Sequence, residues 1–160
     1  LAVSIINQQL STASADAVRE RAFAVLGEVT PERVLETDEG ALREAGLSES
    51  KVDYLNATAQ AFRDHDYSRD GLAHLDDAAV VERLTDIRGV GEWTAEMYLM
   101  FVLGREDVLP LGDLAVRRGI QQLYGDGSEL SREEMRAVGE RWRPYRSYGT
   151  RYVWREYESD

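Results

Sequence analysis

The chain has 160 residues, 30 of them acidic and 19 basic, and a formal net charge of −11. This length suffices for one domain with its own hydrophobic core. The chain has no cysteine, which excludes disulfides, cysteine-ligated zinc and iron–sulfur clusters. No apolar stretch approaches the roughly 20 residues that cross a bilayer, so no membrane partner is expected. The chain starts inside an apolar stretch and without Met, and we therefore expect an N-terminal segment to be missing.

The charge is unevenly distributed along the chain. Lys51 is the only lysine, and every other basic residue is arginine. Such an acidic, almost lysine-free surface favours a protein of a salt-rich cytoplasm, although an ordinary arginine-biased acidic protein has the same composition. Residues 28–86 hold fifteen acids and six bases, whereas residues 136–155 hold six arginines and one acid. Residues 136–155 could therefore contact phosphates although the chain as a whole is acidic.

Signals for helix starts and stops recur along the chain, whereas signals for strands are nearly absent. A buried helix is predicted for residues 2–9, and a second helix for residues 11–26, which Gly27 ends. Later start signals stand at Thr30-Pro31, Thr37, Ser48, Asp76 or Asp77, Asp113, the Ser131/Glu134 capping box and after Pro144. The side chains predicted to face inward are Val3, Ile5 and Ile6, then Ala13, Ala17, Phe23 and Leu26, then Val52, Leu55, Ala59 and Phe62. The pattern predicts an all-α domain of about nine or ten short helices.

Residues 93–103 differ from the other predicted helices because they leave no polar face. A helix of this kind is expected to be buried all round, at the centre of the domain. Gly89 and Gly91 directly precede it, and Val90 between them is predicted to point inward. Glycine lets the backbone approach another molecule, and the first amides of a helix can bind a phosphate. A tight turn without a ligand uses the same glycine pattern.

The stretch L-T-D-I-R-G-V-G-E-W-T-A resembles the helix–hairpin–helix of the HhH-GPD superfamily of DNA repair glycosylases. L-P-L-G-D at residues 109–113, S-I-I-N-Q-Q-L-S at 4–11 and W-R-P-Y-R-S-Y-G-T-R-Y-V-W-R at 142–155 resemble its 3-methyladenine DNA glycosylase II branch. The resemblance implies one all-α glycosylase domain over residues 1–160, with the helix–hairpin–helix at about residues 78–103. It also implies a monomer in the cytoplasm of a prokaryote, associated with the nucleoid, that removes 3-methyladenine and 7-methylguanine from double-stranded DNA.

Asp113 falls where this family places its catalytic carboxylate. Cleavage of an N-glycosidic bond gives the sugar oxocarbenium character, which a nearby carboxylate stabilises while it also activates water. An aspartate at a helix start is equally an ordinary N-cap, and spacing alone leaves both interpretations open. The resemblance favours catalysis.

Trp93 stands near the position where bifunctional relatives carry a lysine that attacks the sugar. Lys51 is expected far away, on an outer helix. We therefore expect a monofunctional enzyme, which releases a base without cutting the strand.

The resemblance also suggests how a flipped base is held. The residues expected to line the base pocket are Trp93, Met97, Tyr145 and Trp142. The residues expected to fill the gap in the duplex are Gln9 as first choice, then Gln8 and Leu10. Core packing is the alternative for the pocket residues, and a surface pair that ends a helix is the alternative for the glutamines.

The DNA backbone is expected to meet the hairpin and the basic segment. The residues assigned to this contact are Arg88, Gly89, Val90, Gly91 and Thr94, with Arg143, Arg146 and Arg151. A solvated basic face is the alternative for the arginines. No cofactor is required by the resemblance, but a Na⁺ or K⁺ ion held by the backbone carbonyls of Thr85, Ile87 and Val90 is expected. His65 and His74 are expected on the surface, without a metal.

Two other functions stay open at this point. One is a glycosylase for deaminated or oxidised bases, which the sequence does not separate from the alkylpurine enzyme. The other is a non-catalytic helix–hairpin–helix module that binds DNA for architecture. An aspartate in the catalytic position and an aromatic-rich interior argue against the module, because binding of the DNA backbone requires neither.

Overall fold

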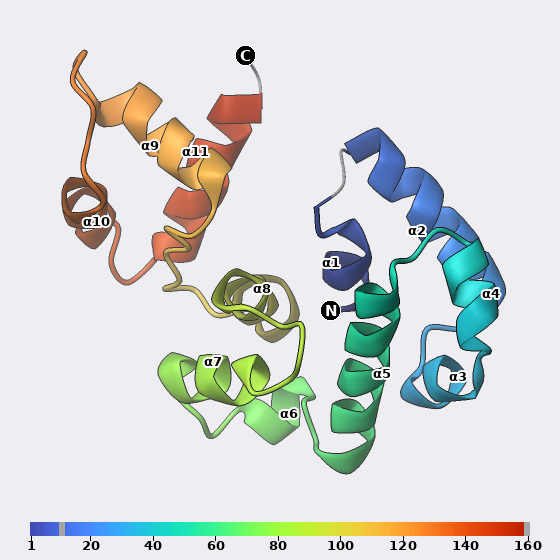
Figure 1. Ribbon diagram of the computed structural model, residues 1–160. Coiled ribbons are helices and arrows are strands. Elements are labelled where there is room, and N and C mark those ends of the chain that lie inside the picture. The colour runs from blue at the N-terminus through green and yellow to red at the C-terminus, as the bar shows by residue number, and fades with distance from the viewer. Residues whose placement is uncertain (10–11, 159–160) are drawn as a thin grey trace. The chain divides into compact units, whose positions relative to one another are not determined.

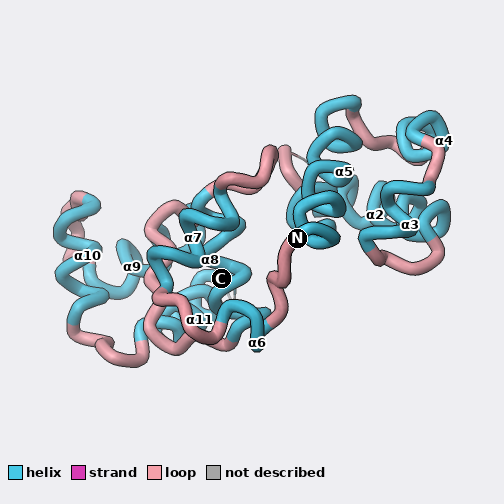
Figure 2. The backbone as a smooth tube through the Cα atoms, turned by 90° about the horizontal axis from the view of Figure 1, so that it is seen from below, coloured by secondary structure: helices cyan, strands magenta, loops and turns pink. Residues whose placement is uncertain are grey.

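The computed structural model describes residues 1–9 and 12–158. Within these residues the chain is all helix and loop, with eleven α-helices, one π-helix and no strand (Figure 2). The α-helices are α1 Ala2–Asn7, α2 Thr12–Leu26, α3 Pro31–Glu36, α4 Glu39–Glu44, α5 Glu49–Asp64, α6 Arg69–Leu72, α7 Asp77–Thr85, α8 Glu92–Tyr98, α9 Leu114–Tyr124, α10 Arg132–Glu140 and α11 Arg146–Glu158. The predicted all-α class is confirmed. No helix in this part of the chain is long and apolar enough to span a bilayer.

The chain divides into two compact units, Leu1–Thr94 and Ala95–Asp160 (Figure 1). The boundary falls inside α8, so the segment predicted as one central helix contributes to both units. The expected hairpin belongs to the first unit, and Asp113 belongs to the second. That the whole chain acts as a single glycosylase domain stays a prediction.

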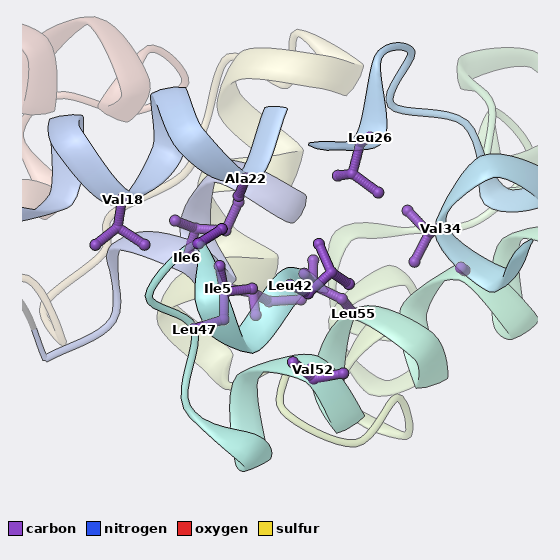
Figure 3. Close-up of a cluster of buried hydrophobic side chains, with 12 residues drawn as sticks. Ile5, Ile6, Val18, Ala22, Leu26, Val34, Leu42, Leu47, Val52 and Leu55 are labelled. Atoms are coloured by element: carbon purple, nitrogen blue, oxygen red, sulfur yellow. The ribbon is translucent and has the colours of Figure 1, made fainter. Parts of the chain in front are cut away.

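The core of the first unit lies where α1 packs against α2 and α5, with α3 and α4 also against α5. Figure 3 shows side chains from these helices pointing toward one another, and Ile5 and Ile6 are fully buried there. Each such side chain contributes about 1.5–3 kcal/mol by leaving water. Val3 was predicted to face this core, but 43% of it is exposed.

The predicted inner face of α2 is confirmed at Leu26, which is fully buried, and is wrong at Ala17, which is exposed. Phe23 is partly buried against the core, and the side chain of Ala13 lies outside the described residues. The other buried residues of the helix are Ala15, Val18 and Ala22. Because α2 is rich in alanine and weakly amphipathic, its own spacing does not select one face, and the contacts with α1 and α4 decide it.

Local capping signals give most of the helix starts correctly. The side chains of Thr30 and Ser48 accept hydrogen bonds from the amides of the first turn, and Ser131 and Glu134 form the predicted capping box. The start predicted at Thr37 is displaced, because Asp38 caps α4. The Thr37 hydroxyl instead donates to the Arg33 carbonyl, 2.6 Å away, at the end of α3.

Lys51 is not on an exposed outer face. It is 8% exposed, and its Nζ donates to the carbonyl oxygen of Ile6 over 2.7 Å. This carbonyl lies in the last turn of α1, where a cation also interacts favourably with the helix dipole. Burial lowers the pKa of Lys51. The only lysine of the chain therefore stabilises the end of α1.

The apolar stretch after the hairpin is not buried all round. The π-helix Leu99–Leu103 follows α8 and ends at Gly104, whose φ is 69°. A π-helix contains more residues per turn than an α-helix, so the side chains beyond α8 rotate away from α-helical positions. Leu99, Met100 and Leu103 take the buried side, whereas 56% of Phe101 and 43% of Val102 are exposed. Trp93, at the start of α8, is also 40% exposed.

The core of the second unit forms where α9 packs against α10 and α11. It contains Leu111, Val116, Ile120, Met135, Val138 and Val153. Gly119 makes the close approach of α9 and α11 possible, because a Cβ at this position would lie 2.6 Å from the carbonyl oxygen of Val153. The start of α9, where Asp113 lies, is thereby fixed against α11.

Candidate active site

The predicted hairpin connects α7 to α8 in the first unit. Gly89 has φ +91°, and a Cβ there would lie 2.2 Å from Cγ of Tyr54. Only glycine fits both this backbone conformation and this close approach. Val90 is 5% exposed, and its amide donates to the carbonyl of Ile87 over 3.0 Å. The prediction that Val90 points inward is confirmed.

Gly91 lies on the open side of the same hairpin. It is exposed, and no atom lies within 4 Å of the position that a Cβ would occupy. The amides of the first helical turn after it have no acceptor inside the helix. Glu92 also places a carboxylate in this turn. The groups that this turn itself offers to a phosphate are therefore backbone amides, and its own side-chain charge, on Glu92, is negative.

Two hairpin side chains assigned to the DNA backbone differ in accessibility. The Arg88 side chain is 71% exposed, pairs with Asp53 at 3.5 Å and lies over the ring of Tyr54 at 6.0 Å. An exposed ion pair of this kind is weak, and contact of Arg88 with a phosphate stays a prediction. Thr94 is 3% exposed, and its side chain does not reach the surface.

The residues assigned to the wedge follow α1. The Gln8 side chain donates from Nε2 to the carbonyl oxygen of Gly89 over 3.0 Å, which ties the end of α1 to the hairpin. Gln9 is exposed and has φ 59°, a left-handed conformation that is uncommon for a residue with a side chain. Leu10 lies outside the described residues. Insertion of any of them into DNA stays a prediction.

Asp113 caps α9, as its sequence context predicts. Its Oδ1 accepts the amide of Val116 over 2.9 Å and the indole N–H of Trp154 over 3.0 Å. The Nη1 of Arg117 donates to the carbonyls of Leu111 and Gly112, each at 2.8 Å. The loop before Asp113 and its carboxylate are therefore both held in place.

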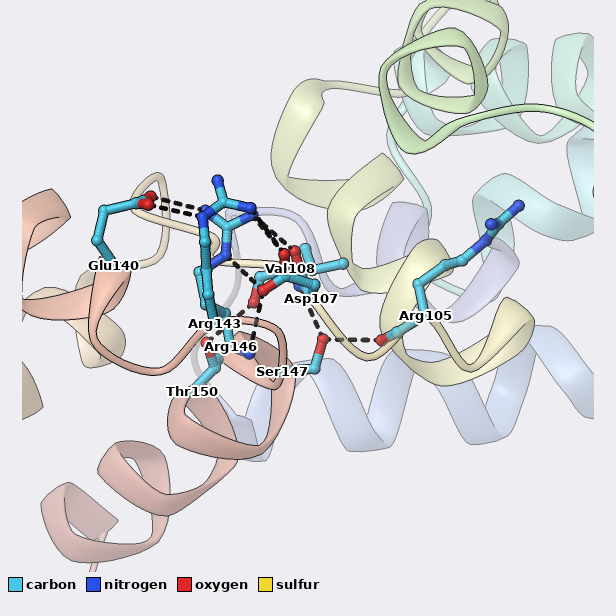
Figure 4. Close-up of polar contacts among 8 residues, drawn as sticks. All are labelled: Arg105, Asp107, Val108, Glu140, Arg143, Arg146, Ser147 and Thr150. Carbon is cyan, nitrogen blue, oxygen red and sulfur yellow. Dashed lines mark hydrogen bonds and ion pairs between the residues drawn. The ribbon is translucent and has the colours of Figure 1, made fainter.

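Arg143 and Arg146 are engaged within the second unit. Figure 4 shows their guanidinium groups between the carboxylates of Asp107 and Glu140. Arg146 binds both carboxylate oxygens of Asp107, at 2.7 and 3.1 Å, and its side chain is only 16% exposed. Arg143 contacts Asp107 at 2.8 Å and Glu140 at 2.6 Å. Contact with phosphates stays a prediction for these two residues, and Arg151 is exposed.

The loop that contains Asp107 is also joined to the start of α11, by Ser147 and Thr150. The Ser147 hydroxyl donates to the carbonyl of Arg105 and accepts the amide of Val108, at 2.8 and 3.0 Å. The Thr150 hydroxyl donates to the carbonyl of Val108 over 3.3 Å. Together with the Arg146–Asp107 pair, these bonds fix the segment that leads to Asp113.

The ion pairs of Asp107 predict a defined acid sensitivity. Burial alone would raise the pKa of Asp107, but hydrogen bonds from Arg146 and the charges of Arg146 and Arg143 lower it. The folded protein therefore binds this proton less readily than the unfolded chain, whose aspartates have a pKa of about 3.9. The stabilisation is present above that value and is lost as the pH falls below it, toward the lower pKa of the folded state.

We expect Asp107→Asn to be less stable than the wild type at neutral pH, and the difference to shrink below about pH 4. The free energy of unfolding, measured against urea across this range, checks it. Glu129→Gln, which alters an exposed acid, is the control. A difference that is the same at every pH would contradict the prediction.

The four residues assigned to the base pocket lie in different settings. Trp93 and Met97 are one turn apart on α8, and Met97 is half-buried. Tyr145 is 56% exposed and meets Tyr148 edge to face at 6.1 Å. Trp142 packs against the core of the second unit, where a Cβ on Gly149 would lie 2.5 Å from its ring. Trp142 is thus partly buried and Tyr145 largely exposed, and a place in the base pocket stays a prediction for all four residues.

Sequence reasoning missed Trp154, Asp107 and Ser147. Their partners lie 41, 39 and 42 residues away along the chain, so no local pattern connects them. The indole of Trp154 also stacks on Phe101, with ring centres 5.9 Å apart and planes inclined by 13°. The sequence showed these residues only as members of helices or of a charged loop.

The carbonyls of Thr85, Ile87 and Val90 have the chemistry that an alkali cation requires, since hard cations prefer oxygen ligands. The Ile87 carbonyl accepts one hydrogen bond, from Val90, and keeps a second lone pair. The described residues contain no group of three or more His, Cys, Asp or Glu suited to a metal ion.

Comparison with known proteins identifies the family. The model described as HhH-GPD superfamily base excision DNA repair protein matches residues 2–144. The YfjP protein of Bacillus subtilis is 32% identical over 162 residues, which cover 96% of this chain and 56% of that protein. The solved structure of a DNA-3-methyladenine glycosidase from Bacillus halodurans matches with TM-score 0.88 and 35% identity, covering 98% of this chain and 73% of its own.

A second solved structure contains DNA. It is a 3-methyladenine DNA glycosylase of Schizosaccharomyces pombe in complex with abasic DNA, with TM-score 0.83 and 30% identity over 96% of this chain and 76% of its own. The resemblance seen in four separate stretches of the sequence is thereby confirmed. The chain belongs to the HhH-GPD superfamily of base excision DNA repair proteins.

Proposed function

We propose that this protein is a monofunctional DNA glycosylase that removes alkylated purines from double-stranded DNA during base excision repair. The observation that carries the proposal is the Asp113 carboxylate, whose Oδ1 accepts two hydrogen bonds at the start of α9. The names of the relatives, which include 3-methyladenine glycosylases, support the substrate class. The chain spans 56% of the length of the YfjP protein. That alkylated purines are the substrate and double-stranded DNA the partner is therefore proposed here for this chain.

The chemistry requires one well-placed anion. As the bond between C1′ of the sugar and the purine nitrogen breaks, its electron pair leaves with the base and positive charge develops on the sugar. The Asp113 carboxylate stabilises that charge and takes a proton from the water that attacks C1′. An N-alkylated purine is already cationic and leaves as a neutral base, so no acid is needed to protonate it.

The proposed lack of strand cleavage follows from the amines of the chain. Strand cleavage by a bifunctional enzyme begins with attack of an amine on the sugar. Lys51 is the only lysine, and its amine is buried against the carbonyl of Ile6. Trp93 occupies the position near which bifunctional relatives carry their lysine. We therefore propose hydrolysis by water as the only route.

Backbone binding is assigned to the hairpin. The amides around Gly91, with Arg88 beside them, would hold one phosphate, and a Na⁺ or K⁺ ion at the carbonyls of Thr85, Ile87 and Val90 would add positive charge. Arginine contacts weaken as salt rises through counterion release, whereas neutral amides release no counterions. This division suits an acidic protein in a salt-rich cell. We propose that the protein binds DNA as a monomer.

The test is single-turnover base release from duplexes that contain 3-methyladenine or 7-methylguanine, at high KCl. We expect free alkylated base and an abasic strand that stays intact until it is heated in alkali. Duplexes with hypoxanthine or 8-oxoguanine test the alternative substrates. A strand cut without alkali, together with trapping by borohydride, would contradict the monofunctional assignment. A folded protein that binds duplexes without releasing any base would support the architectural module instead.

A further inference from the structure

Trp154 bears directly on the carboxylate to which the proposed function assigns catalysis. As the N-cap of α9, the Asp113 carboxylate accepts the Val116 amide at Oδ1 over 2.9 Å, a bond that comes from its own helix. The Trp154 indole N–H, from another helix, reaches the same oxygen over 3.0 Å. Two donors from different directions fix the plane of the carboxylate.

The indole itself is supported on several sides. Trp154 is half-buried and packs against the core of the second unit. Phe101 lies parallel to it, at 5.9 Å between ring centres. Phe101 comes from the π-helix Leu99–Leu103, a type of helix that is frequent at functional sites. The irregular helix therefore supplies the aromatic face that keeps the indole N–H directed at Asp113.

The chemical character of the donor matters as well. An indole has one N–H, no acceptor and no charge. It orients a carboxylate without neutralising it, whereas a guanidinium in the same place would form an ion pair and reduce the field at the sugar. In the same unit Asp107 receives such guanidinium groups, from Arg143 and Arg146. The two carboxylates therefore have partners of different kinds.

We infer that Trp154 is a positioning residue, which orients the Asp113 carboxylate for base excision while leaving its negative charge intact. This inference rests on the proposed function. It predicts that loss of the indole N–H slows the chemical step and leaves DNA binding unchanged. A purely structural role would change stability without separating these two quantities.

Trp154→Phe removes the N–H and keeps an aromatic ring. We expect the single-turnover rate of base release to fall by about 10- to 100-fold, as for a small misplacement of a reacting group. The affinity for a duplex with an abasic-site analogue should stay within about twofold. Trp154→His restores a ring N–H and should recover part of the rate.

The matched control is Tyr157→Phe. Tyr157 lies on the same helix and accepts a hydrogen bond from Arg118 of α9 over 3.0 Å, so the substitution removes a polar contact between the same two helices without touching Asp113. Its rate of base release should equal that of the wild type. Equal rate losses in Trp154→Phe and Tyr157→Phe would overturn the inference.

A second readout does not depend on activity. The chain has three tryptophans, so its ¹H–¹⁵N spectrum shows three indole signals, and Trp154→Phe identifies one of them. That signal should exchange slowly with water and should move in Asp113→Asn. If the chemical shift of this indole signal is the same in Asp113→Asn as in the wild type, the inference is overturned even if the enzyme is active. If the signal moves but the protein releases no base, the hydrogen bond between Trp154 and Asp113 is supported and the proposed glycosylase function is contradicted.

Discussion

Asp113→Asn is expected to lower the single-turnover rate of base release by about 10²–10⁴-fold while the protein stays folded. The amide keeps an oxygen that can accept the bonds from Val116 and Trp154, and asparagine caps helices about as well as aspartate. What the variant loses is the negative charge and the base that activates water. Rapid-quench measurement of base release, with the melting temperature alongside, separates these effects.

The control for this substitution is Asp38→Asn. Asp38 is also an N-cap aspartate, with Oδ2 at 2.9 Å from the amide of Ala41, but it caps α4 in the first unit. Its rate of base release should match the wild type. If Asp113→Asn releases base at the wild-type rate, the carboxylate is only a helix cap and the proposed mechanism is wrong.

The second large effect is expected in the hairpin, from Gly89→Ala. A methyl group there would meet the ring of Tyr54 at 2.2 Å, on a backbone with φ +91°. The left-handed backbone costs a non-glycine residue about 1–2 kcal/mol, and the overlap costs a further 1–3 kcal/mol or so. We therefore expect Gly89→Ala to be destabilised by about 2–5 kcal/mol, as measured by urea denaturation.

Gly91→Ala separates stability from binding in the same hairpin. The added methyl meets no atom within 4 Å, and Gly91 is outside the left-handed region, so stability should change little. If a phosphate approaches the backbone here, the methyl occupies that space, and the affinity for duplex DNA should fall by about tenfold or more. Binding equal to the wild type, in a folded Gly91→Ala protein, would exclude this side of the hairpin from the DNA contact.

The parts of the fold that could be predicted are those whose chemistry is local. The Thr30 cap and the Ser131–Glu134 capping box each need residues only three positions apart. The position of Asp113 at the start of α9 follows from the same rule. The inward Val90 follows from an apolar residue enclosed by two glycines.

Contacts between distant parts of the chain could not be predicted. The buried side of α2 is selected by other helices, because an alanine-rich helix has no strong face of its own. Lys51 was expected on an outer helix, and its acceptor, the Ile6 carbonyl, lies 45 residues away along the chain, where no local pattern indicates it. The exposure of Phe101 depends on a π-helical turn, which no spacing in the apolar stretch indicates.

In the candidate site, too, the residues that belong to local motifs were predicted and those that depend on long-range contacts were not. Its main residue, Asp113, and the hairpin glycines were identified from motifs. The groups that hold Asp113 and the segment before it in position were not: Trp154 had no assigned role, and Arg146 was assigned to the DNA backbone rather than to Asp107. Whether a group of arginines forms a basic face depends on the acids that pair with them in the fold. Asp107, which pairs with Arg143 and Arg146, lies well outside the arginine-rich segment, so the sequence did not indicate this pairing.

The buried position of Lys51 makes its amine a reporter of opening in the first unit. Acylating reagents and lysine-modifying enzymes meet no exposed lysine while Nζ donates to the Ile6 carbonyl. Modification requires the end of α1 to separate from α5, so the rate of acylation of Lys51 measures how often this local opening occurs. Acylation removes the charge of Lys51 and adds bulk to it, so we expect an acylated Lys51 to hinder the return of α1 to its place against α5.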